Sequence, residues 1–144
     1  MSEARNKLYE MQFPSRWGDM DVLGHVNNTM YFRYFENVRT EWLREQGYSI
    51  TLEGSAEGPV IVDACCQFLI PAVYPVKLQA LMFGGAPGRS SFNSYYELRD
   101  AEQPDIIFCT GSSRIVWIDY AKGKSIALPE SIRLLLPNSL QTNK

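Results

Sequence analysis

The sequence has few of the residues that build metal and disulfide sites. It contains one histidine, His25, and three cysteines, Cys65, Cys66 and Cys109. An odd number of cysteines with one adjacent pair is a poor disulfide framework, and no C-x-x-C motif is present. A zinc site built from the usual nitrogen and sulfur ligands is therefore not expected, and the sequence predicts no metal.

The sequence also lacks the signatures of several large functional classes. The 14 Lys and Arg against 16 Asp and Glu leave a net charge of -2, which is not the charge of a nucleic-acid or anionic-membrane binder. No apolar run approaches the roughly 18–20 residues of a membrane-spanning helix, and no secretion signal precedes the first strand. Nucleotide-binding glycine loops and a G-x-S-x-G elbow are missing. These absences predict a cytoplasmic protein without nucleic-acid or membrane partners.

What the sequence does contain is enough apolar material for one folded domain. Hydrophobic residues make up 45% of the 144 residues, and aromatic residues make up 12%. This composition is typical of a globular chain and argues against disorder. We expect a single domain over residues 1–144, with its core at about 8–136.

The apolar spacing predicts one long helix at residues 29–46. Four residues recur at spacings of four, three and four, which places them on one helical face: Tyr31, Phe35, Val38 and Trp42. An Asn or Thr at positions 27–29 can cap the helix start. Gly47 can supply the left-handed stop. Met30, Phe32, Tyr34 and Leu43 widen the apolar face, so we expect a sheet curled around this helix.

The remaining apolar runs predict strands on both sides of the helix in the sequence, at residues 8–17, 60–70, 76–83, 89–99 and 106–118. Several of these runs exceed the usual five or six residues of a strand, as long curved antiparallel strands would. Gly111 is a candidate for a β-bulge. A short helical turn is expected at 132–136.

The densest group of polar side chains lies between the first strand and the helix. Asp19, Asp21, His25, Asn27 and Asn28 fall within ten residues. A helix N-terminus offers unpaired N–H groups that can polarise a carbonyl oxygen, and a nearby carboxylate can activate water or attack as a nucleophile. The pattern thus fits acyl transfer, although Asp and Asn also form turns and caps without any catalytic role.

The run at 19–31 resembles the signature D-x-D-x-x-x-H-V-N-N-x-x-Y of the 4-hydroxybenzoyl-CoA thioesterase-like branch of the hotdog-fold superfamily. The matching residues are Asp19, Asp21, His25, Val26, Asn27, Asn28 and Tyr31. Weaker matches follow at 35–39, 89–92, 116–119 and 128–130. The resemblance covers about residues 8–136.

This resemblance implies an α+β hotdog fold, a five-stranded antiparallel sheet wrapped around one long helix, assembled as a homodimer that in many members pairs again into tetramers. It also implies hydrolysis of acyl-CoA thioesters at sites on the dimer interface. By the resemblance, Asp21 is the catalytic carboxylate, and backbone N–H groups near Asn28 and Thr29 hold the thioester carbonyl. His25 and Asn27 would shape the loop and orient the carboxylate or water.

The substrate contacts implied by the resemblance extend to the strand at 89–99. Arg89 is the favoured contact for the phosphates of CoA, and Ser90 or Ser91 of the neighbouring subunit would help to place water. The acyl pocket would be walled by helix aromatics: Tyr31, Phe32 and Phe35. Coenzyme A is then part of the substrate, and no separate cofactor is expected.

Several alternatives stay open at the level of sequence. The substrate can be a thioester of CoA or of an acyl-carrier protein, and Asp21 can act as nucleophile or general base. A non-catalytic hotdog module that binds an acyl ligand would need no carboxylate at the carbonyl. The hydratase and dehydratase branch of the same fold uses a different Asp/His helix motif, which is not found here.

Overall fold

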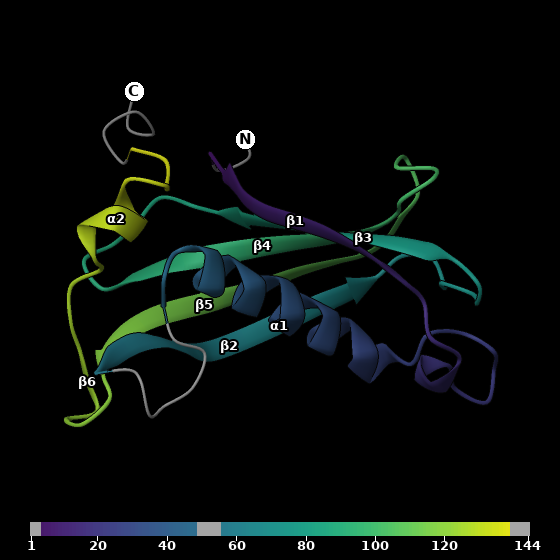
Figure 1. The fold of residues 1–144 in the computed structure, drawn as a ribbon, viewed down its shortest axis with the longest axis horizontal. Coiled ribbons are helices and arrows are strands. Elements are labelled where there is room, and N and C mark those ends of the chain that lie inside the picture. The colour runs from purple at the N-terminus through teal and green to yellow at the C-terminus, as the bar shows by residue number, and fades with distance from the viewer. Residues whose placement is uncertain (1–3, 49–55, 139–144) are drawn as a thin grey trace.

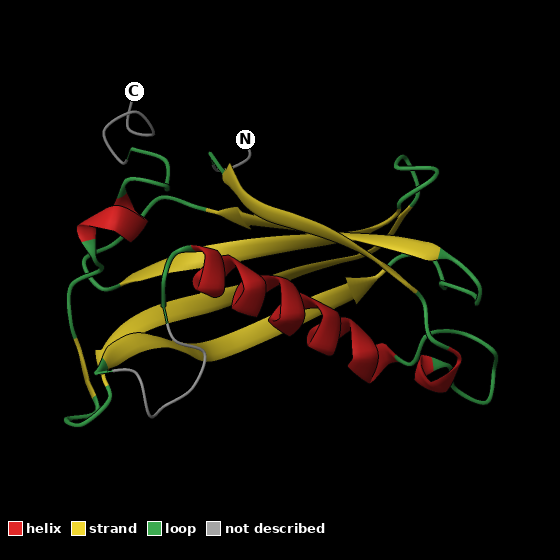
Figure 2. Ribbon diagram, viewed as in Figure 1, coloured by secondary structure: helices red, strands yellow, loops and turns green. Residues whose placement is uncertain are grey.

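The computed structural model describes residues 4–48 and 56–138, which form a curved sheet with a long helix across one face (Figure 1). The elements in chain order are β1 (Asn6–Pro14), a 3-10 turn (Trp17–Asp19), α1 (Asn28–Glu45), β2 (Glu57–Phe68), β3 (Lys77–Gly84), β4 (Ser91–Asp100), β5 (Ile107–Asp119), β6 (Lys124–Ser125) and α2 (Glu130–Arg133). Figure 2 shows the same arrangement by secondary structure.

The strands pair in the order β1-β3-β4-β5-β2, and β6 pairs with β5 beside this path. All five pairings are antiparallel. The predicted hotdog fold is confirmed. The described residues contain six strands rather than the five expected, because the chain after β5 folds back as a two-residue strand.

Helix α1 begins and ends where side-chain chemistry predicts. The side chain of Asn27 accepts hydrogen bonds from the Thr29 N–H at 3.0 Å and the Thr29 hydroxyl at 2.9 Å, so Asn27 is the N-cap among the three candidates. Gly47 has φ +89° just after the helix, a conformation that costs glycine little.

The core lies between α1 and the concave face of the sheet. The helix buries five side chains there: Tyr31, Tyr34, Phe35, Val38 and Trp42. The expectation that Phe32 widens this buried face is wrong, because its side chain is 43% exposed. The sheet therefore covers one side of the helix and leaves the flank that carries Phe32 open.

Gly111 serves helix packing rather than a bulge. It stays in register with Cys66 on β2 and with Tyr96 on β4, and the register shifts lie elsewhere in the sheet. A Cβ atom at Gly111 would lie 2.7 Å from Cε2 of Phe35. The glycine is needed because the Phe35 ring approaches the β5 backbone closely.

Gly111→Ala is expected to lower the free energy of unfolding by about 1–3 kcal/mol, the usual cost of overpacking a core. The buried Phe35 ring stacks on Tyr96 at 5.0 Å between centroids and has little room to move. Gly18→Ala is the matched control, since its added Cβ meets nothing within 4 Å. Urea unfolding of both variants measures the difference, and equal midpoints would contradict this account of Gly111.

Candidate active site

The loop before α1 is closed by its own backbone. The Asp21 N–H donates to the His25 carbonyl at 2.8 Å, and the Gly24 N–H donates to the Asp21 carbonyl at 3.0 Å. The chain reverses direction at Gly24, whose φ of +81° is a conformation that favours glycine. A bridge from His25 to Val73 ties the loop to the chain after β2. These bonds give the loop one defined conformation at the helix start.

Main-chain donors hold the Asp21 carboxylate in place. Its Oδ1 accepts the N–H of Leu23 at 2.9 Å and the N–H of His25 at 3.3 Å. Its Oδ2 has no hydrogen-bond partner among the described residues. One oxygen therefore fixes the orientation of the half-buried carboxylate, and the other keeps its lone pairs for a ligand.

Asp21 faces a cavity of about 200 Å³ between the loop, the first turn of α1 and the end of β2. The lining residues are Asp21, Leu23, His25, Val26, Asn28, Tyr31, Phe68, Leu69, Ile70 and Pro71. The structure thus brings four of the predicted site residues to one cavity: Asp21, His25, Asn28 and Tyr31. Burial raises the pKa of the Tyr31 phenol, which keeps this wall uncharged.

The opposite wall at 68–71 was not anticipated from the sequence. Their sequence predicts the end of an apolar strand, and their side chains carry no group that indicates a catalytic or binding site. Yet Phe68, Leu69 and Ile70 are exposed to solvent. Only the position of this segment beside the helix start makes it part of the cavity.

The helix start supplies one main-chain donor rather than two. The Thr29 N–H already donates to Asn27 Oδ1 at 3.0 Å, so it cannot hold a carbonyl oxygen while the cap is intact. The Asn28 N–H has no acceptor in the described part of the chain, and Asn28 lines the cavity. The expected pair of donors at Asn28 and Thr29 therefore narrows to Asn28.

The two aspartates of the motif point to different surroundings. Asp19 accepts the hydroxyl hydrogen of buried Tyr34 at 2.7 Å through Oδ2. Burial, together with this hydrogen bond, raises the pKa of Tyr34. The Asp19 carbonyl also accepts the Asn27 N–H at 2.9 Å. Asp19 is thus bonded to the helix and the core, while Asp21 faces the cavity.

Asp19→Ala is expected to destabilise the fold by about 1–3 kcal/mol, because it leaves the buried Tyr34 hydroxyl without its acceptor. The double variant with Tyr34→Phe removes both partners and should lose less than the sum of the two single variants. Thermal and urea unfolding of the four proteins in this cycle give the coupling. Strictly additive losses would show that the bond adds nothing to stability.

Arg89, Ser90 and Ser91 lie at the other end of the sheet. Ser91 pairs with Val116, which also pairs with Val60 at the start of β2. The Asp21 cavity is at Phe68, eight residues further along β2, or about 26 Å away. A single chain therefore does not bring these three residues to Asp21. The Ser91 hydroxyl instead accepts a hydrogen bond from Arg114 Nη2 at 2.9 Å.

Among residues 4–48 and 56–138, no three His, Cys, Asp or Glu side chains are grouped so that they could hold a metal ion. In the same residues, no helix combines the length and the apolar character needed to cross a membrane.

Comparison with known proteins identifies the family to which the chain belongs. Residues 15–136 match the family model of the thioesterase-like superfamily. The protein belongs to this superfamily. The matched region runs from the end of β1 to the chain after α2, so it includes the Asp21 loop and the whole helix.

Two solved structures and one curated protein are similar to this chain over most of their length. The PA2801 protein of Pseudomonas aeruginosa, provisionally named a thioesterase, is 39% identical, with 89% of this chain and 97% of that chain covered at a TM-score of 0.82. The YsmA protein of Bacillus subtilis is 25% identical over 78% of this chain and 74% of its own. Slr0204 of Synechocystis, a 1,4-dihydroxy-2-naphthoyl-CoA thioesterase, is 18% identical at a TM-score of 0.78, with 88% and 93% covered. That last likeness shows the fold alone.

Proposed function

We propose that the protein is an acyl-CoA thioesterase that hydrolyses a thioester to a free acid and CoA, with Asp21 as its catalytic carboxylate. Membership of the thioesterase-like superfamily supports thioester hydrolysis as the reaction class. The CoA thioester named for the Synechocystis relative supports the substrate class. The observation that carries the proposal is that Asp21 and Asn28 line one cavity at a helix N-terminus, and that the Asn28 N–H has no acceptor in the described residues.

The reaction needs a polarised carbonyl and a placed oxygen nucleophile. The thioester oxygen accepts the Asn28 N–H, where the positive end of the α1 dipole stabilises developing negative charge. Asp21 Oδ2 then removes a proton from water, whose oxygen bonds to the carbonyl carbon. The C–S bond breaks, and the thiolate leaves and takes up the proton. Alternatively Oδ2 itself attacks the carbonyl carbon, and the thiolate leaves as a mixed anhydride forms. Water then hydrolyses the anhydride to the free acid and the Asp21 carboxylate, and the thiolate takes up the proton that water releases.

The neighbouring motif residues act mainly through the main chain. His25 donates its N–H to Asp21 Oδ1, and its carbonyl accepts the Asp21 N–H, so it positions the carboxylate from both sides. Asn27 caps the helix by accepting the Thr29 N–H, and so fixes the helix start at which Asn28 lines the cavity. The exposed wall at 68–71 and the Tyr31 ring give the acyl group an apolar surface.

A second copy of the chain would complete the site. β2 pairs only with β5 in the described sheet, so its other edge is open to pairing, and an exposed edge strand of this length is a ready template. Antiparallel pairing of two β2 strands around a two-fold axis would set the Val60 end of one strand beside the Phe68 end of the other. Arg89, Ser90 and Ser91 of the second copy would then approach Asp21. Two such dimers would pair into a tetramer, as in many members of the family.

Asp21→Asn is expected to lower kcat/KM for thiol release from acyl-CoAs by about 10²–10⁴-fold, the usual contribution of a general base. The amide oxygen of Asn can still accept the Leu23 and His25 N–H groups, so folding should be unchanged. Asp105→Asn, at an exposed residue on the β4–β5 turn, is the matched control. A screen over acyl-CoAs and acyl-carrier proteins measures release. Undiminished turnover in Asp21→Asn would exclude this role.

Light scattering is expected to give a molar mass of twice the 16.4 kDa of one chain, or a multiple of that dimer mass. Val62 on β2 is 56% exposed, and Val62→Lys puts a charge on the proposed interface, which should weaken the dimer and reduce activity with it. Leu134→Lys, at a 75% exposed residue beside α2, is the control. A fully active monomer would rule out the shared site.

A further inference from the structure

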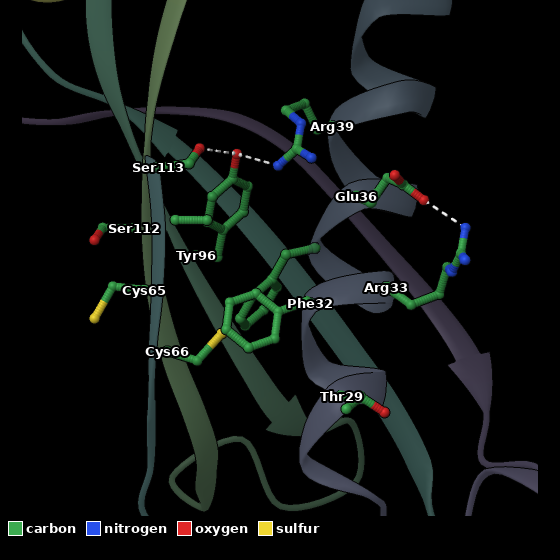
Figure 3. A pocket seen from close by; sticks show the side chains of 12 residues that line it. Thr29, Phe32, Arg33, Glu36, Arg39, Cys65, Cys66, Tyr96, Ser112 and Ser113 are labelled. Atoms are coloured by element: carbon green, nitrogen blue, oxygen red, sulfur yellow. Dashed lines mark hydrogen bonds and ion pairs between the residues drawn. The ribbon is translucent and has the colours of Figure 1, made fainter. Parts of the chain in front are cut away.

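A second cavity lies further along the flank of α1, between this helix and strands β2, β4 and β5. Its volume is about 260 Å³, and Thr29, Phe32, Phe35, Arg39, Cys66 and Tyr96 are among the residues that line it. Figure 3 shows Phe32, Cys66, Tyr96 and Arg39 pointing into the space between helix and strands. Its walls are mixed: aromatic rings and Cys66 line part of it, Ser112 and Ser113 line another part, and the Arg39 guanidinium lies beside Tyr96.

Arg39 has no acidic partner in the described chain. Its Nη1 donates to the Tyr96 hydroxyl at 3.1 Å, and no carboxylate oxygen of residues 4–48 and 56–138 lies within 4.0 Å of its guanidinium. Glu36 also lines the cavity, but it accepts a hydrogen bond from Arg33 at 2.7 Å, and Figure 3 shows this pair on the side of the helix away from Tyr96. The half-buried Arg39 guanidinium lies over the Tyr96 ring, 5.9 Å from its centroid, and within these residues no carboxylate neutralises its charge.

A buried hydroxyl network holds the residue that Arg39 contacts. The Tyr96 hydroxyl bonds to Ser113 Oγ at 3.0 Å and to Ser94 Oγ at 2.7 Å, and all three residues are buried. Tyr96 is thus fixed as an acceptor for one N–H of Arg39. A guanidinium has five N–H donors, so the others remain for a ligand in the cavity.

This cavity and the Asp21 cavity lie along one interface, between α1 and β2. The Asp21 cavity uses Asn28 and the end of β2, and the second cavity uses the helix from Thr29 to Arg39 and β2 at 64–66. Arg39 follows Asn28 by eleven positions, which is about 16 Å along a helix. The two cavities share no lining residue, so an acyl group whose carbonyl is held at Asn28 reaches Arg39 only if it runs along this flank of the helix.

We propose that this second cavity is an acyl subsite for groups that end in a carboxylate, with Arg39 as the residue that determines specificity. The inference rests on the proposed thioesterase function. A guanidinium and a carboxylate form charge-assisted, frequently bidentate hydrogen bonds. An acyl group with an apolar end would instead cover the charge of Arg39 without pairing it, which is unfavourable.

The test compares CoA thioesters of matched carbon number, with and without a terminal carboxylate, from six to twelve carbons. Wild-type protein is expected to favour the carboxylated member in kcat/KM by about 10–100-fold at the length that reaches Arg39. Arg39→Met should abolish this ratio, and Arg39→Lys should restore part of it. Arg44→Met, an exposed position on the same helix outside the cavity, should leave the ratio unchanged.

A binding measurement separates this inference from the proposed function. Calorimetry with Asp21→Asn measures the affinity for each pair without turnover. Selective binding in the absence of any wild-type hydrolysis would keep the subsite and overturn the thioesterase proposal. Hydrolysis with a wild-type ratio of one or less at every length, or a ratio that survives Arg39→Met, would overturn the subsite. If neither binding nor hydrolysis is detected, the subsite and the thioesterase proposal are both overturned.

Discussion

The closure of the loop before α1 by main-chain hydrogen bonds is the constraint on which the candidate site depends. Asp21 Oδ1 accepts two backbone N–H groups, and Asn27 caps the helix that follows. A carboxylate on a loose loop would lose conformational freedom each time it met a substrate. Here that cost is met during folding, because the bonds that close the loop also orient the carboxylate beside the helix start.

Some residues of the motif stabilise the fold, and others are placed for chemistry. Asp19 bonds to the buried Tyr34 hydroxyl and so ties the loop to the core, while Asp21 keeps one oxygen open to the cavity. The Asn27 side chain accepts the Thr29 N–H, so the Asn28 N–H is the donor that remains available at the helix start. Residues that are neighbours in sequence and similar in chemistry therefore have different roles, and the difference comes from what each one faces.

The way α1 crosses the sheet creates the space for a ligand. The helix buries one face and leaves the flank with Phe32 open toward β2, the edge strand. Both cavities lie on that flank, and β2 has an unpaired edge within the described sheet. Substrate binding and self-association are thus proposed for adjacent parts of one surface. Ser91 lies far from Asp21 within one chain, and a site built from two copies of the chain is consistent with that distance.

The sequence alone determined the fold class, the bounds of α1 to within one residue, and the loop that carries the carboxylates, because helical spacing, capping and turn residues are local properties. It misjudged Gly111 and Phe32, whose roles depend on how closely the helix packs on β5 and which flank the sheet covers. Only the tertiary structure decided which aspartate faces the cavity, that the wall at 68–71 belongs to it, and that Arg39 has no acidic partner among the residues described. Those properties arise from contacts between segments far apart in the chain, and no local pattern encodes them.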